Sequence, residues 1–157
     1  MTEGRDFRLR LAQWPQDMNP IREVRTEVFI EEQNVSQEEE WDGLDDQCLH
    51  ILALDDNDDP VGTARLLPEG KIGRMAVLKA WRGKGVGAAM LEMLMQEAEA
   101  HGFSEVRLAA QVHAMPFYEK FGFTAYGEEF MDAGIPHYWM KAPLAPPVVD
   151  AGAETGE

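Results

Sequence analysis

The sequence predicts an α/β protein with a single mixed, mostly antiparallel sheet of about seven strands, flanked by about four helices. Short β-rich apolar runs alternate with stretches of helical periodicity, in the order strand, helix, short helix, three strands, helix, strand, helix, two strands. The length of 157 residues suits one domain. A sheet with helices packed on it buries the apolar faces of both kinds of element, so one layered domain satisfies this order.

The N-terminal third is predicted to hold one strand and two helices. Residues 7–14 alternate apolar and polar side chains, as in a half-buried strand. Asp17 and Asn19 can cap the helix that follows, whose apolar positions have helical spacing and stop near Gln33. A second, short helix or loop is expected at 38–43.

Three strands are expected next, as an antiparallel meander. The apolar runs 47–54 and 61–67 are separated by the acidic, proline-ended stretch 55–60, which is a strong turn signal. Gly70 then precedes a third run at 71–78.

The C-terminal half begins with the longest predicted helix, at 85–101, and Gly102 suits the position just after its end. The remaining elements are a strand, a short helix and two strands, at 105–110, 113–121, 123–130 and 136–142. Residues 143–157 contain three prolines and little apolar content. We therefore expect a domain at 1–142 and a disordered tail at 143–157.

Composition argues against several classes of protein. The single cysteine, Cys48, allows no disulfide within the chain and fits a reducing compartment. The first residues lack the apolar segment of a signal peptide, and no apolar run approaches the roughly 18 residues of a membrane span. The net charge of −15 would repel a phosphate backbone. We expect a cytoplasmic protein without a nucleic-acid or membrane partner.

Charge is distributed unevenly along the chain. Residues 23–59 contain fourteen acidic residues and one cation, Arg25, whereas residues 70–91 contain five cations and no acid. One stretch could attract cations, and the other could attract anions.

The segment 75–88 is the most informative part of the sequence, because a predicted strand runs there into a glycine-rich turn that opens a helix. Glycines let a ligand approach the backbone without clashes with Cβ atoms. The first amides of a helix have no partner within it and lie at the positive end of its dipole, an arrangement that binds phosphate. Arg82 and Lys84 add positive charge at the rim.

Two phosphate-binding motifs fit this turn poorly. A nucleotide-hydrolysing P-loop needs Ser or Thr after Gly-Lys, and Gly85 follows Lys84 here. The dinucleotide fingerprint is nominally matched by Gly83, Gly85 and Ala88. It expects a strand directly before the first glycine and an acid roughly 20 residues later. A charged turn intervenes instead, and the next strand ends at Gln111.

A third pattern, Arg-x-x-Gly-x-Gly over Arg82, Gly85 and Gly87, resembles the pyrophosphate loop of the GNAT acetyltransferase superfamily. The segment 111–123 supports the resemblance, since it is similar to the family's late motif of an amide residue, an aromatic-Tyr pair and Gly-Phe. Many members have Asn where this chain has Gln111, which offers the same hydrogen-bonding groups. The resemblance spans roughly residues 7–142.

More narrowly, the chain resembles the ElaA-like branch of that superfamily. The residues that carry this resemblance lie in five short segments, Val28-Phe29-Ile30-Glu31-Glu32-Gln33, His50, Ile72-Gly73-Arg74, Ala110-Gln111-Val112-His113 and Gly134-Ile135-Pro136-His137.

The resemblance implies the GNAT fold, acetyl-CoA as cosubstrate, no metal, and direct attack by a primary amine of a small molecule, polyamine or peptide. For the oligomeric state, we expect a monomer or homodimer. The implied cofactor-binding residues are Met75, Ala76, Val77, Arg82, Gly83, Lys84, Gly85, Val86, Gly87, Ala88, Gln111 and Tyr118. The backbone groups of Met75 and Val77 would pair with the pantetheine arm, and the Val77 amide would stabilise the oxyanion.

Catalysis by this route needs a neutral amine and a proton for the leaving thiolate. The family pattern assigns the second task to Tyr118, which could otherwise be a core tyrosine. For the base, Glu32 resembles the acceptor side of the family site, and His113 is a candidate because it lies at a predicted helix start. Residue chemistry alone also leaves His50, His137 and a water chain open.

The acidic stretch 38–46 lies where the family's acceptor loop is expected, so a cationic amine is one candidate acceptor. A solvated acidic surface is the alternative. Two other functions remain open at this stage, a non-catalytic acyl-CoA sensor and an acyl-homoserine-lactone synthase. The late tyrosine motif argues against the synthase.

Overall fold

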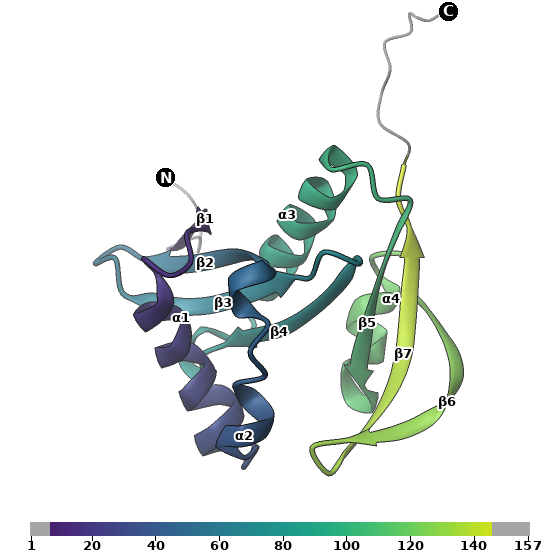
Figure 1. Cartoon of the computed structure of the whole chain (residues 1–157), viewed down its shortest axis with the longest axis horizontal. Coiled ribbons are helices and arrows are strands. Elements are labelled where there is room, and N and C mark those ends of the chain that lie inside the picture. Colours follow the sequence, from purple (N-terminus) through teal and green to yellow (C-terminus); the bar gives the residue numbers. More distant parts are fainter. Residues whose placement is uncertain (1–6, 146–157) are drawn as a thin grey trace, which may run out of the picture.

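Seven strands form one sheet in the computed structural model, which describes residues 7–145 (Figure 1). Their order in the sheet is β1-β2-β3-β4-β5-β7-β6. The strands are β1 Phe7–Ala12, β2 Leu49–Asp55, β3 Pro60–Leu66, β4 Lys71–Val77, β5 Glu105–Gln111, β6 Thr124–Asp132 and β7 Ile135–Pro143. Of these seven described strands, only β4 and β5 pair in parallel. The predicted fold class and the antiparallel meander of β2, β3 and β4 are thereby confirmed.

Helices lie on both faces of this sheet (Figure 1). They are α1 Met18–Arg25, the π-helix η1 Thr26–Glu32, α2 Gln37–Glu40, α3 Val86–Ala100 and α4 Met115–Glu119, with 3₁₀ turns η2 Asp45–Gln47, η3 Lys79–Trp81 and η4 Val112–Ala114. The helix α1 covers β3 and β4 on one face, α3 covers the other face, and α4 packs against β5.

The first helix differs from the continuous one that the sequence predicts. It begins as an α-helix and widens into a π-helix at Thr26, where the amide of Gln33 bonds the carbonyl of Val28. Asp17 stands at its N-cap, but its carboxylate accepts hydrogen bonds from Arg10 and the Gln13 amide instead. These contacts hold the pKa of Asp17 at about 2. Because π-helical turns cluster at functional sites, the end of this helix is a candidate part of the functional site.

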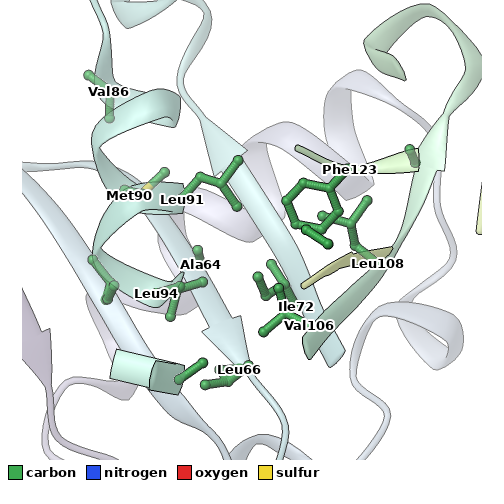
Figure 2. Packing of buried hydrophobic residues seen from close by; sticks show 14 of the residues in the cluster. Ala64, Leu66, Ile72, Val86, Met90, Leu91, Leu94, Val106, Leu108 and Phe123 are labelled. Atoms are coloured by element: carbon green, nitrogen blue, oxygen red, sulfur yellow. The ribbon is translucent and has the colours of Figure 1, made fainter. Parts of the chain in front are cut away.

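The main core lies between α3 and the sheet (Figure 2). The helix buries one stripe of side chains at helical spacing, consisting of Val86, Met90, Leu91, Leu94 and Ala98. It ends as predicted, because Gly102 adopts a left-handed backbone with φ 88°. The amides of Gly102 and Phe103 bond the carbonyls of Glu99 and Ala98, which satisfies the last turn of the helix.

The strands β4 and β5 separate along their length. Lys71 pairs with Arg107 and Ile72 with Leu108, and beyond these two pairs the strands diverge (Figure 1). The edge of β4 that faces β5 is therefore without a strand partner from Gly73 onward. This opening splits the sheet and adjoins the turn before α3.

The tail that the sequence predicts at 143–157 falls largely outside the described residues. Its first residues are folded, since Pro143 ends β7 and Leu144 is buried, with its amide bonded to the Ser104 carbonyl. Within residues 7–145, no helix is both long enough and apolar enough to cross a bilayer.

Candidate active site

The turn between β4 and α3 presents backbone amides with little side-chain cover. Gly83 and Gly85 have φ of 77° and 89°, and a Cβ atom added at either would meet no atom of residues 7–145 within 4 Å. Gly85 caps α3 without any side-chain hydrogen bond, and the first turn contains no acid. These amides are free to hold an anion, aided by the dipole of a 15-residue helix.

The turn lies directly beside the opening in the sheet. A Cβ atom on Gly87 would stand 3.9 Å from Cγ2 of Val77 and 3.8 Å from Cζ of Phe117. The start of α3 therefore adjoins both the end of β4 and the helix α4. A ligand bound at these amides would have a direct path into the opening between β4 and β5.

Arg82, the first residue of the Arg-x-x-Gly-x-Gly pattern, forms a two-pronged ion pair with Glu32. Its Nη1 and Nη2 donate to the two carboxylate oxygens at 2.6 and 2.7 Å, and its Nε donates to the Val77 carbonyl at 2.9 Å. The hydrogen bonds from Arg82 lower the pKa of Glu32. Glu32, one of the predicted bases, thus sits at the glycine turn rather than among the residues lining the cleft described next.

A cleft of about 250 Å³ occupies the opening. It is lined by β4, β5, α4 and the β6–β7 turn, and across from them by side chains of the segment 29–40. Three predicted site residues, Met75, Gln111 and Tyr118, meet there. The volume lies just below the roughly 300–1,000 Å³ typical of drug-sized ligand sites, so a small molecule or the end of a longer one would fit.

Tyr118 projects from α4 into the wall of this cleft. Its ring contacts Phe117 and Phe123 edge-on, with centroids 5.1 and 5.9 Å apart. Burial raises the pKa of the phenol to about 12. A phenol with this pKa stays protonated, and because its hydroxyl has no hydrogen bond to another described residue, it can donate to a ligand.

Gln111 ends β5 at the mouth of the opening. Its Nε2 donates to Oε1 of Gln33 at 3.1 Å, which joins β5 to the end of the π-helix across the cleft. His113, the other predicted base, lies two residues further on in the exposed turn η4 and does not line the cleft.

His137 is the histidine that does line it. It pairs with Gln111 across β5 and β7 and is 7 % exposed. Its Nδ1 lies 2.7 Å from the Ile135 carbonyl. A carbonyl only accepts, so Nδ1 carries the proton and Nε2 keeps a lone pair in the neutral ring, with no partner among the described residues. The sequence left His137 among three candidate histidines, and the register between β5 and β7 places it beside Gln111.

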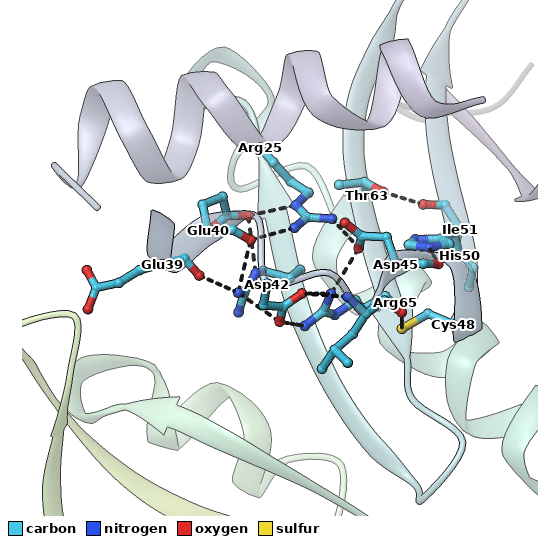
Figure 3. A network of polar contacts seen from close by, with 12 residues as sticks. Arg25, Glu39, Glu40, Asp42, Asp45, Cys48, His50, Ile51, Thr63 and Arg65 are labelled. Atoms are coloured by element: carbon cyan, nitrogen blue, oxygen red, sulfur yellow. Dashed lines mark hydrogen bonds and ion pairs between the residues drawn. The ribbon is translucent and has the colours of Figure 1, made fainter. Parts of the chain in front are cut away.

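Three of the six acids in the stretch 38–46 that the sequence singles out are paired with arginines (Figure 3). Arg25 bonds Glu40 at 2.6 Å and Asp45 at 2.7 Å, and Arg65 bonds Asp42 at 2.6 Å and Asp45 at 2.9 Å. Arg74 of β4 completes this set, which we call the arginine network. Its three arginines balance Glu40, Asp42 and Asp45.

Other titratable groups near the arginine network are held in structural roles. The Nε2 of His50 bonds the Asp45 carbonyl at 2.8 Å, its ring stacks on Trp14, and burial lowers its pKa. Burial raises the pKa of the Cys48 thiol to about 11, which leaves it a poor nucleophile. Within residues 7–145, no group of three or more His, Cys, Asp or Glu side chains could hold a metal ion.

Comparison with known proteins agrees with this architecture. A family model described as acetyltransferase (GNAT) domain matches residues 17–144. YjcF of Bacillus subtilis, described as an uncharacterised N-acetyltransferase, is 45% identical over 121 residues, which cover 74% of this chain and 86% of YjcF. The chain therefore belongs to the GNAT acetyltransferase superfamily.

Its place within that superfamily follows from two further likenesses. The ElaA protein of Escherichia coli is 35% identical over 76% of this chain and 83% of its own. Its crystal structure superposes with a TM-score of 0.78 over 87% of this chain and 99% of that one. The chain thus lies in the ElaA-like branch, as the sequence predicts.

Two other solved structures share the fold. An acyl-CoA N-acyltransferase from Pseudomonas aeruginosa is 30% identical, with a TM-score of 0.77 over 87% of this chain and 99% of that chain. An aminoglycoside 6'-N-acetyltransferase complexed with coenzyme A has a TM-score of 0.69 over 87% and 98% of the two chains, at 16% identity. The latter shows a likeness of fold alone.

Proposed function

We propose that the protein is an acetyl-CoA-dependent N-acetyltransferase that acetylates a primary amine in the cleft between β4 and β5. The observation that carries the proposal is the continuity of three features. A helix N-terminus with uncapped amides and open glycines adjoins an unpaired strand edge, and that edge leads to a buried tyrosine. This arrangement provides one site for a diphosphate and another for a reacting thioester.

The residues at the turn fit the phosphate end of coenzyme A. The amides from Gly85 to Ala88 would hold the pyrophosphate, because no described side chain caps them or fills the space beside Gly83 and Gly85. Lys84 would add charge at the rim. A protein of the same fold has been crystallised with coenzyme A, which supports coenzyme A as the ligand.

The opening between the strands fits an extended acyl-pantetheine arm. The edge of β4 lacks a strand partner from Gly73 to Val77, so its peptide groups could pair with the arm as a neighbouring strand would. When bound, acetyl-CoA supplies the activated acetyl group. The Val77 amide would donate to the carbonyl oxygen as charge builds there.

Tyr118 would stabilise the departing sulfur as a hydrogen-bond donor. Its pKa of about 12 keeps the phenol protonated at every physiological pH. An ordinary thiol has a pKa of about 8.5, but burial in the same cleft raises this value as well. The difference between the two groups shrinks, which favours sharing of the Tyr118 proton with the sulfur.

Among the candidate bases, His137 has the most suitable geometry. Glu32 is engaged by Arg82, His50 is engaged by the Asp45 carbonyl, and His113 lies outside the cleft. The free Nε2 of His137 could take a proton from the amine directly or through one water. The strand pairing with Gln111 keeps it beside the end of β5.

Release of free thiol from acetyl-CoA, measured over a panel of small amines, polyamines and peptides, tests this proposal. An N-acetyltransferase releases thiol only when a suitable amine is present, and acetylated amine appears in equal amount by mass spectrometry. Binding of coenzyme A without thiol release for any amine would instead favour the acyl-CoA sensor.

A further inference from the structure

One arginine joins the two walls of the cleft. Arg74 lies in β4, the strand whose unpaired edge faces the opening, and it lines the cleft. Its Nη2 donates to the carbonyls of Glu39 and Glu40 at 3.0 and 3.1 Å, and its Nε lies 3.2 Å from a carboxylate oxygen of Glu40. Both partners belong to the segment 29–40, which lines the cleft across from β4 and which we call the acceptor wall.

The helix α2, at the end of the acceptor wall, depends on such contacts for its position. It has four residues, too few for a helix that is stable by itself. Ser36 caps its start, since its Oγ accepts a hydrogen bond from the Glu39 amide at 3.1 Å. The last carbonyls of a helix have no partner within it. For the Glu39 carbonyl, Arg74 is the one hydrogen-bond donor among the described residues.

The acids that Arg74 contacts have closer partners in the arginine network. Glu40 bonds Arg25 of α1 at 2.6 Å. Asp42 bonds Arg65 of β3 at 2.6 Å. Arg74 stands 3.2 Å from each of these two acids. Removal of Arg74 therefore leaves neither acid unpaired, and what is lost is the direct link between α2 and β4.

The backbone of β4 is distorted at Arg74. Its φ of 50° is a left-handed conformation, which strains a residue that has a Cβ atom. Gly73 pairs with Arg65 and Ala76 with Thr63, so β4 holds one residue more than β3 between these pairs. Such a bulge re-aims a side chain, and strained residues persist where their surroundings over-determine the conformation. The bulge and the bonds to α2 together constrain the position of this guanidinium.

This inference rests on the proposed function. We propose that Arg74 is a positioning residue for the acceptor, because by bonding the end of α2 from β4 it sets the distance between the acceptor wall and the strand edge that holds the thioester. It contacts neither the amine nor the acyl group. Loss of Arg74 therefore lets the acceptor wall shift, while the turn before α3 continues to bind coenzyme A.

Steady-state thiol release with an amine that the wild-type protein acetylates tests this role. Arg74→Met should lower kcat/KM for the amine by about tenfold to a hundredfold, because small displacements of a reacting group slow a reaction by such factors. The KM for acetyl-CoA and the Kd of coenzyme A, measured by calorimetry, should change by less than about twofold. Arg74→Lys should lose less than Arg74→Met, since an ammonium keeps the charge but lacks the planar fork.

Arg74→Gly is a second variant, because glycine adopts a φ of 50° without strain and the backbone of β4 is preserved. It should show the same loss for the amine and the same affinity for coenzyme A. Arg107→Met is the matched control, since Arg107 pairs with Glu69 at 3.7 Å and does not line the cleft. It should leave kcat/KM for the amine unchanged.

Two results would overturn the positioning role and leave acetyl transfer standing. One is an unchanged kcat/KM for the amine in Arg74→Met and Arg74→Gly, and the other is an equal loss of affinity for coenzyme A in both variants. Absence of thiol release by the wild-type protein with every amine would overturn both proposals.

Discussion

The glycine turn before α3 and the cleft between β4 and β5 adjoin each other but differ in which groups they offer to a ligand. The turn is made by consecutive residues and offers backbone groups, so its chemistry depends on φ angles and on the lack of side chains. The cleft is assembled from side chains of several distant segments, backed by buried ion pairs. A substitution in the first should act through backbone shape, and one in the second through the loss of a particular charge or proton.

The largest expected effect lies in the arginine network behind the cleft. Arg25→Met leaves the carboxylates of Glu40 and Asp45 buried with fewer partners, which should cost about 3–5 kcal/mol of unfolding free energy. Urea unfolding measures this loss. Arg8→Met is the control, because both partners of the Arg8–Asp58 pair are more than half exposed, at 55% and 69%, and such pairs contribute at most about 1 kcal/mol. Similar losses for the two variants would contradict the assigned role of burial.

The cleft should respond strongly to removal of its histidine. His137→Phe keeps an aromatic ring that can stack on Phe130 but removes the free nitrogen, so kcat/KM for the amine should fall by about a hundredfold or more. The affinity for coenzyme A, measured by calorimetry, should not change. His113→Phe in the exposed turn η4 is the matched variant. A large loss there, with none at position 137, would support His113 as the base instead.

Tyr118→Phe should lower kcat by about tenfold to a hundredfold, since it removes a hydrogen bond to a sulfur that gains charge. Steady-state thiol release measures the effect, and the dissociation constant of coenzyme A should stay the same. Tyr126→Phe on the exposed strand β6 is the control. An unchanged kcat in Tyr118→Phe would remove the phenol from the mechanism.

Gly85→Ala tests the turn itself. Alanine at φ 89° is strained by about 1–2 kcal/mol, and the amides it displaces should bind coenzyme A about tenfold more weakly. Gly127→Ala pays a similar strain at φ 76° and also meets no neighbouring atom, but it lies in β6, away from the turn. Calorimetry should therefore show reduced affinity only for the first variant. Equal affinities of the two variants for coenzyme A would contradict the assignment of its binding to this turn.

The smallest effect concerns acid stability. Burial acts to raise the pKa of Asp42, but hydrogen bonds from Arg65 and the Leu44 amide outweigh it and hold the value at about 2. A carboxylate with a lowered pKa stabilises the fold above pH 4, and this contribution is lost as the pH falls toward 2. Asp42→Asn should flatten the decline in unfolding free energy by about 1–2 kcal/mol over that range. Asp56→Asn, in an exposed turn, should keep the wild-type slope.

The contrast between the two regions also explains what the sequence could predict. The turn at Arg82–Gly87 and the end of α3 at Gly102 are local features, since the residues that shape them are adjacent in the chain. The alternation and spacing of apolar residues likewise placed all seven strands and the main helices. The switch from α1 to a π-helix at Thr26 left no such signal, because Val24 and Val28 are buried at ordinary helical spacing.

The cleft could be predicted only in part. Tyr118 and Gln111 came from a recognisable motif, but Glu32 pairs with Arg82 fifty residues away, which no local pattern encodes. The arginines of the arginine network are also far in sequence from the acids they bind, since Arg65 bonds Asp42 across 23 positions. His137 became distinct from the other histidines only when the register of β5 and β7 was known.

Amide chemical shifts of the ¹⁵N-labelled protein, recorded while coenzyme A is added, test the central claim most directly. The account predicts that the largest changes occur at Gly85, Val86 and Gly87, with further changes along β4 to Met75. If the protein showed no response at these amides at saturating coenzyme A, or if the largest changes lay on another face, the turn would not be the diphosphate site and the proposed acetyl transfer would lose its foundation.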